Sequence, residues 1–232
     1  RFSQQLYTLT ATGDLHARSL VVDGLSLLRD RPVGLDLAME VRDHAEFHFK
    51  KGHLTVSRQE FGVTGSIRQT EEGLLFDASV NGTRLSMQHL LEGLPEAWGR
   101  HLEGYRGKGD LAFSGTLQGL WTQSRVPRMD ATFEVKGAEL SHPASGLQLK
   151  DLQFSGRFDN GEACRAETTS IHLSGLHATV TDGVLRGSGG VRNLKAPYID
   201  LQLYADMNAR ELVQLLRLDA VRDASGRILA DV

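Results

Sequence analysis

Among the residues of this chain that could bind a metal are its nine histidines. His44, His48 and His53 are close together in the sequence, and Glu46 lies between the first two. A metal centre needs three or four converging ligands, each oriented by further hydrogen bonds. The spacing of these residues instead follows the polar face of a β-hairpin. The sequence therefore predicts no metal site and no cofactor.

A catalytic nucleophile would need a base beside it, and no such arrangement is recognisable. The single cysteine, Cys164, has no local signature, and the chain has no Gly-x-Ser-x-Gly motif. Gly187-Ser188-Gly189-Gly190 resembles a phosphate-binding loop, but such loops lead into a helix, whereas Val191-Arg192-Asn193-Leu194 continues as a strand. Paired carboxylates such as Glu71-Glu72 fall at turns. We expect a strand that bends at glycines, and a chain that is not an enzyme.

The charge balance excludes one further class of function. Lys and Arg number 26, Asp and Glu number 29, and no block of like charges occurs. Nucleic-acid binders carry basic stripes because phosphate contacts supply most of their affinity.

The chain also has no stretch of about 18 apolar residues, the length that a membrane-spanning helix needs. It begins with Arg1 and ends within a predicted strand at 226–230, so we expect a piece of a longer protein.

Alternation of apolar and polar residues dominates the chain. The strands that it predicts must position any functional side chain. From Val33 to Val41 every second residue is apolar, and similar alternation recurs at short intervals to Leu203. This pattern predicts strands with one apolar and one wetted face. Glycine-containing pairs separate the strands and predict tight antiparallel turns. They are Asp23-Gly24, Lys51-Gly52, Glu72-Gly73, Asn160-Gly161 and Asp182-Gly183. The fold class predicted is mainly β: an extended, curved antiparallel sheet.

One pattern occurs twice, and Gly190 lies 125 positions after Gly65. In each copy a strand is predicted to turn, at Asn81-Gly82 or at Met207-Asn208, into a short amphipathic helix. The helices are predicted over about 86–102, with a break at Pro95, and from Asn208, a good N-cap. These repeats predict a first unit at 1–105, a second at 106–220 and the start of a third at 221–232.

Three segments in order resemble a known family. They are 102–115 (LEGYRGKGDLAFSG), 147–161 (LQLKDLQFSGRFDNG), and 196–203 (APYIDLQL) followed by 211–216 (ELVQLL). Together they are similar to the periplasmic repeat region of AsmA-like proteins of Gram-negative bacteria, best over about 75–220. The resemblance implies an inner-membrane-anchored protein with a long periplasmic β-groove, of the bridge-like lipid transfer type. It also implies phospholipid movement toward the outer membrane, with the anchor lying in a segment not included here.

The expected partners are therefore phospholipid acyl chains, with envelope proteins as possible partners and no nucleic acid. Large apolar residues of the alternating strands should line the groove. We expect these to be Leu35, Leu37, Phe47, Phe49, Phe76, Leu111, Phe113, Phe133, Val135, Leu149, Phe154, Leu201 and Leu203. With about a dozen strands some 4.8 Å apart, the sheet would extend roughly 50–60 Å.

Two other functions are open at this point. One is a structural or adaptor module of outer-membrane assembly, whose apolar faces form a closed, dry core. The other is a carbohydrate-binding β-sandwich, which needs exposed aromatic residues on a polar face. Only Trp98 and Trp121 are available as tryptophans, and Trp98 lies in a predicted helix, so this function ranks last.

Overall fold

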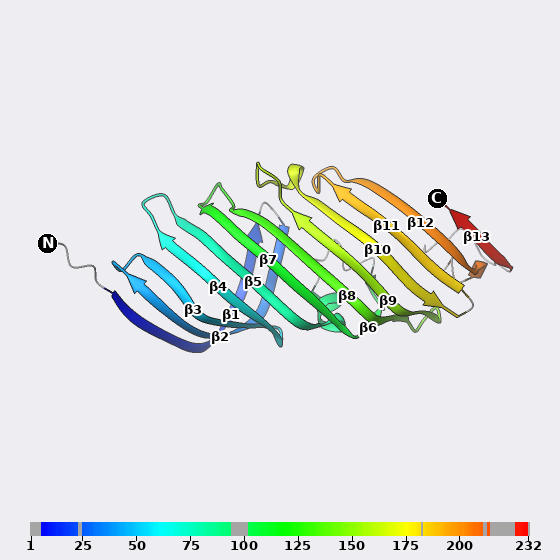
Figure 1. The fold of residues 1–232 in the computed structure, drawn as a ribbon, viewed down its shortest axis with the longest axis horizontal. Coiled ribbons are helices and arrows are strands. Elements are labelled where there is room, and N and C mark those ends of the chain that lie inside the picture. The colour runs from blue at the N-terminus through cyan, green and yellow to red at the C-terminus, as the bar shows by residue number, and fades with distance from the viewer. Residues whose placement is uncertain are drawn as a thin grey trace.

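The computed structural model describes residues 6–22, 25–93, 102–181, 183–210, 213 and 226–231, and shows one long antiparallel sheet (Figure 1). The strands are β1 (Leu6–Val22), β2 (Leu25–Arg42), β3 (Glu46–Val56), β4 (Gln59–Gln69), β5 (Leu74–Ser86), β6 (Arg106–Lys108), β7 (Asp110–Trp121), β8 (Arg128–His142), β9 (Leu147–Asp159), β10 (Ser170–Val180), β11 (Gly183–Arg192), β12 (Tyr198–Asn208) and β13 (Arg227–Asp231). Helix α1 is Met87–Gly93, and a short 3-10 turn, η2, is Ala166–Thr168.

The sheet is a meander in which nearly every strand pairs with the next one along the chain. Only β6 lies off this path and pairs with β8. The predicted mainly β fold class is confirmed, with thirteen strands and little helix in the described part of the chain. Because β5 pairs with β7, the sheet continues across the predicted boundary at 105/106. The division into units stays a prediction.

Two of the predicted turns are wrong, because the strands continue through them. Lys51-Gly52 lies inside β3 and Asn81-Gly82 lies inside β5, each next to a β-bulge. The turn that ends β3 is instead Ser57-Arg58, whose φ angles are 50° and 68°. A side chain at Gly52 would place its Cβ 2.6 Å from the carbonyl oxygen of Val63, so close strand packing requires this glycine. Glu72-Gly73 and Asn160-Gly161 do lie between strands, as predicted.

The connections after β5 and after β12 share one construction. The amide of Met87, at the start of α1, donates to the carbonyl of Gly109 at 3.0 Å, and the amide of Ala209 donates to that of Gly226 at 2.9 Å. Both glycines have left-handed φ angles, 104° and 101°. In each case the next residues begin the returning strand, β7 or β13. The same connection therefore occurs twice. In each copy the carbonyl of a glycine with a left-handed φ angle accepts a hydrogen bond from the first helical amide.

The polar residue before each helix also repeats. Ser86 precedes α1, and Asn208 precedes the helical residues Ala209 and Arg210. These two positions are 122 apart, which differs from the offset of 125 read from the sequence. The bulge between Gly82 and Leu85 adds one residue to β5, and the pairing of β12 shows no bulge, so the bulge accounts for one of the three positions. Of the second predicted helix, only 209, 210 and 213 are described, and the rest lies outside the described residues.

Candidate functional site

The feature with the clearest functional geometry is a continuous row of apolar residues across eleven strands. Residues directly opposite each other on paired strands point to the same face of a sheet. The row consists of Ala11, Leu37, Gly52, Val63, Val80, Gly115, Ala131, Phe158, Ile171, Val191 and Ile199. Every neighbouring pair is in register, and no charged or polar side chain interrupts the row. We call the face that carries this row the apolar face.

A second row on the apolar face alternates large residues with glycine. It runs through Gly82, Phe113, Phe133, Gly156, Leu173, Gly189 and Leu201. A Cβ at Gly156 would lie within 2.1 Å of the ring of Phe133, so the ring lies over the glycine of the next strand. Phe133 also meets Phe154 edge to face, with ring centroids 6.3 Å apart. The glycines therefore let large side chains lie across the strands.

Burial changes along the strands, and β12 shows this most clearly. On its apolar face Met207 is 0% exposed and Ala205 is 1% exposed, whereas Leu201 is 56% and Ile199 is 67% exposed. We call the buried part, where α1 packs, the closed end. Its members are Leu85, Met87, Leu111, Val135, Ala138, Leu147, Leu149, Leu152, Ala178, Val180, Leu185, Ala205 and Met207. The exposed part, which also includes Leu173 at 40%, is the open end.

All thirteen residues predicted to line a groove lie on the apolar face. Leu111, Val135 and Leu149 belong to the closed end, and Phe113, Phe133, Phe154 and Leu203 pack against it. Leu201 belongs to the open end. Leu35, Leu37, Phe47, Phe49 and Phe76 lie on the same face of the N-terminal strands and are partly buried. Their contact with lipid stays a prediction.

Several residues of the apolar face were missing from the predicted lining. Phe158, Ile171, Leu173 and Ile199 belong to its rows and lie toward the open end, where side chains reach solvent. Their alternation was visible in the sequence. Nothing in that pattern distinguishes a solvent-exposed apolar position from a buried one, so the sequence could not rank them above their neighbours.

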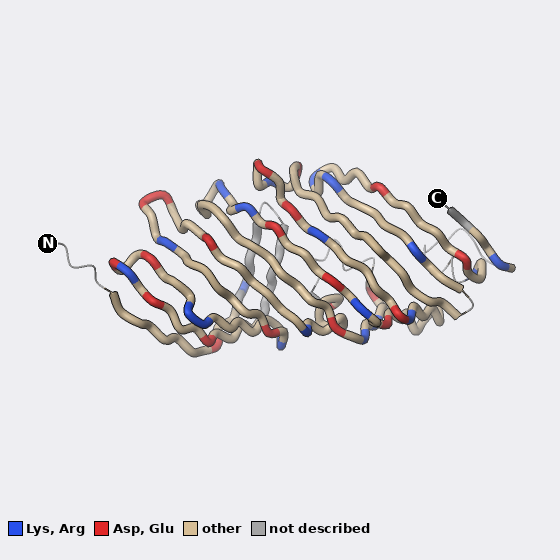
Figure 2. Tube along the Cα trace, viewed as in Figure 1, with Lys and Arg blue, Asp and Glu red and all other residues tan. Residues whose placement is uncertain are grey.

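The opposite face of the sheet is polar and carries ion pairs between neighbouring strands. Arg157 pairs with Asp130, Arg68 with Glu46 at 2.8 Å, and Lys50 with Glu40 at 2.7 Å. Figure 2 shows acidic and basic residues interspersed along the strands and turns. Hydrogen bonds from Lys50 and then from Arg42 lower the pKa of Glu40 to about 2. The contrast between the two faces favours contact of the apolar face with an apolar ligand or a packed core.

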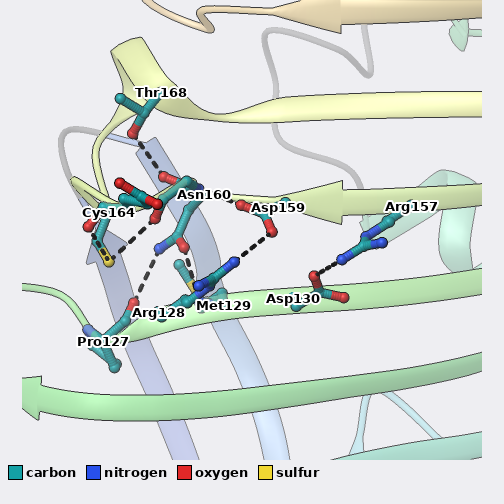
Figure 3. Close-up of polar contacts among 11 residues, drawn as sticks. Pro127, Arg128, Met129, Asp130, Arg157, Asp159, Asn160, Cys164 and Thr168 are labelled. Atoms are coloured by element: carbon teal, nitrogen blue, oxygen red, sulfur yellow. Dashed lines mark hydrogen bonds and ion pairs between the residues drawn. The ribbon is translucent and has the colours of Figure 1, made fainter.

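The rim of the sheet near the start of β10 is held by a buried asparagine (Figure 3). The Asn160 side chain accepts from the amide of Met129 at 2.8 Å and donates to the carbonyl of Pro127 at 3.0 Å. The Thr168 hydroxyl donates to the Asn160 carbonyl at 2.7 Å. Cys164 lies in the same loop, with its sulfur 3.5 Å from the carbonyl oxygen of Gly161. These contacts tie the β7–β8 connection to the β9–β10 connection, which is a structural role.

Two of the histidines singled out in the sequence lie in β3, and the glycine-rich segment lies in β11. His48 lies on the polar face, 3.1 Å from Glu46, and the described residues contain no group of three metal-ligating side chains. The glycines at 187–190 lie within β11, as the sequence predicted, and Gly187 and Gly189 pair with Leu203 and Leu201.

A cleft lined by Thr70, Glu71, Glu72, Leu75 and Leu120 lies at the β4–β5 turn. Leu75 and Leu120 pair on the polar face, so this cleft is separate from the apolar face.

Comparison with known proteins gave no match: no family model matches the chain, and no curated protein or solved structure does. No helix within the described ranges is long and apolar enough to span a membrane.

Proposed function

We propose that this chain is a segment of an AsmA-like, bridge-like lipid transfer protein. In this proposal the parent protein is anchored in the inner membrane, and this segment lies in the periplasm. Acyl chains of phospholipids move along the apolar face toward the outer membrane. The segment does no chemistry, and the rows of paired apolar residues perform its function.

The energetic requirement of lipid transfer explains why continuity matters. A two-chain lipid in water exposes on the order of 30 methylenes, at about 0.8 kcal/mol each, or roughly 24 kcal/mol. An isolated apolar pocket offsets this cost at one position only. A row without polar interruption offsets it at each step along the sheet. The unbroken row from Ala11 to Ile199 is the observation that carries the proposal.

Photo-crosslinking in cells tests the proposal directly. A photoreactive residue at Phe113, Phe133 or Ile199 should form phospholipid adducts, because these positions lie on the apolar face. Thr132 is the matched control, since it neighbours Phe133 but lies on the polar face and is exposed. A folded protein with no adducts at the three positions, or with equal adducts at Thr132, contradicts lipid transfer along this face.

The closed end supports a second candidate, a structural or adaptor module in outer-membrane assembly. Val135, Ala178 and Met207 are almost fully buried, as in a dry core. Native mass spectrometry of the purified protein separates the two functions. Phospholipid that co-purifies supports the conduit. An empty protein that retains an envelope protein instead supports the adaptor.

A further inference from the structure

Two leucines lie side by side on the polar face of the sheet, next to the β4–β5 turn. Leu75 on β5 is directly opposite Leu120 on β7, and Leu75 is 36% exposed. Because β5 is paired with β4 on one side and with β7 on the other, this exposure does not arise from an edge of the sheet. Together with Thr70, Glu71 and Glu72 the leucines line a cleft of about 380 Å³, which we call the turn cleft.

The two carboxylates of the turn cleft have no cationic partner within the described part of the chain. Arg68 lies opposite Leu75 on β4, but its guanidinium donates at 2.8 Å to Glu46 on β3, on the side away from the cleft. Arg125, in the neighbouring β7–β8 turn, forms no ion pair with them either. Figure 2 shows the β4–β5 turn as an acidic tip of the sheet. The cleft therefore combines exposed apolar surface with uncompensated negative charge.

The turn that carries these carboxylates is held in place from both sides. The amide of Thr70 donates to the carbonyl of Gly73 at 2.8 Å, and the Thr70 hydroxyl accepts from the Gly73 amide at 3.2 Å. The amide of Gln69 donates to the carbonyl of Ala45 at 2.7 Å, which ties the turn to the β2–β3 connection. A Cβ at Gly73 would collide with the carbonyl of Trp121, so the turn lies directly against β7. A ligand would thus bind a preformed cleft and lose little affinity to ordering of the turn.

An arginine side chain matches both properties of the turn cleft. Its methylene stem packs on apolar surface while its charged end stays in water, and its planar guanidinium pairs with carboxylates through two N–H donors. Lysine has a compact charge without this fork. The same carboxylates repel anionic lipids and nucleic acids. Because the cleft is open to solvent, a small cation would bury only part of its surface, whereas a polypeptide also gains contacts from the residues beside its arginine.

We propose that the turn cleft binds an arginine of a partner polypeptide, flanked there by apolar residues. The stem of the arginine lies on Leu75 and Leu120, and its guanidinium meets Glu71 and Glu72. The partner contacts the polar face and leaves the apolar face uncovered. This inference therefore does not depend on lipid transfer.

A synthetic peptide tests the proposal with the whole chain. The probe is a blocked peptide of five residues, with a central arginine between two leucines and a serine at each end. In methyl NMR spectra it should shift the signals of Leu75 and Leu120 and leave that of Leu173, on the apolar face, unchanged. Citrulline in place of the arginine keeps the shape, removes the charge and should weaken binding about two- to fivefold. Shifts at Leu173 without shifts at Leu75, or equal binding of the citrulline peptide, overturn the proposal.

Two pairs of substitutions separate a specific contact from general attraction of charge. Glu71→Gln combined with Glu72→Gln should weaken the arginine peptide about two- to fivefold and abolish its preference over the citrulline peptide. Glu60→Gln combined with Glu162→Gln is the matched control, because both residues are exposed, one near the start of β4 and one in the β9–β10 connection. Equal weakening by the two pairs would mean that only the net charge matters, and would overturn the proposal.

The apolar contact and the kind of ligand have their own tests. Leu75→Ser removes apolar surface from an exposed position and should weaken the peptide several-fold, without a change in the circular dichroism of the protein. Undiminished binding to Leu75→Ser contradicts the contact of the arginine stem with the leucines. Arginine amide alone should bind at least about tenfold more weakly than the peptide. Equal binding of arginine amide would assign the cleft to a small cation and overturn the polypeptide partner.

Discussion

The closed and open ends of the apolar face have similar side chains but differ in what covers them. On β12 the same alternation runs from Ile199, which is 67% exposed, to Met207, which is fully buried. On β10 it runs from the exposed Leu173 to the buried Ala178. At the closed end the side chains pack into a core with α1, whereas at the open end they face solvent. One repeating pattern thus forms a packed core at one end and an exposed apolar surface at the other.

The largest expected difference between the two ends is in stability. Leu147 is fully buried, so Leu147→Ala should lower the free energy of unfolding by about 2–5 kcal/mol. Leu201→Ala removes the same atoms at the open end and should cost less than about 1 kcal/mol. Urea or guanidinium unfolding measures the difference, provided that the free energy of unfolding depends equally on denaturant concentration in both variants. Equal losses would mean that the open end is packed as tightly as the core.

The converse difference should appear in lipid content. Ile199→Glu places a charge on the exposed apolar face, and should reduce co-purifying phospholipid several-fold with little change in unfolding. Gln202→Glu adds the same charge on the polar face of the same strand and is the control. Quantitative mass spectrometry of extracted lipid gives the readout. Unchanged lipid in the Ile199→Glu protein would remove the open end from the binding surface.

The two helix connections that bound the closed end should differ by a smaller amount. Asn208 accepts the amide of Arg210 at 2.9 Å, whereas Ser86 accepts that of His89 at 3.5 Å. Asn208→Ala should therefore cost about 1 kcal/mol of stability, and Ser86→Ala should cost less. Thermal or chemical unfolding of the two variants gives both values. A larger loss for Ser86→Ala would show that its side chain has a further role, such as packing beside Gln59. The side-chain amide of Gln59 donates to the carbonyl of Ser86 and accepts from its backbone N–H.

The smallest effect is confined to the polar face and to acidic pH. The pKa of Glu40 is held at about 2 by Lys50 and Arg42, below its usual 4.5. The stabilisation from this carboxylate is therefore present above pH 4.5 and is lost as the pH falls toward 2. Lys50→Met should raise the pKa of Glu40, as followed by carboxyl NMR. Lys51→Met should leave that pKa unchanged, because Lys51 pairs with Asp36.

Much of the apolar face could be predicted from the sequence because a strand has a period of two residues. Once Phe133 and Val135 are on one strand, they must share a face, and the same holds for Leu201 and Leu203. Turns were less predictable. Gly52 and Gly82 looked like turn residues, yet they lie within strands, where each is buried against a neighbouring residue. A glycine needed for close packing has the same appearance in a sequence as a glycine needed for a turn.

The sequence by itself determined the alternating segments, the separation of apolar and polar faces, and the absence of a recognisable catalytic motif. Only the tertiary structure decided which apolar residues are buried and which are exposed. Alternation is a local property of a strand, whereas burial depends on which strands and helices, distant in sequence, pack over it. Ile199 and Met207 occupy equivalent places in the pattern of β12, and only the packing at the closed end distinguishes them.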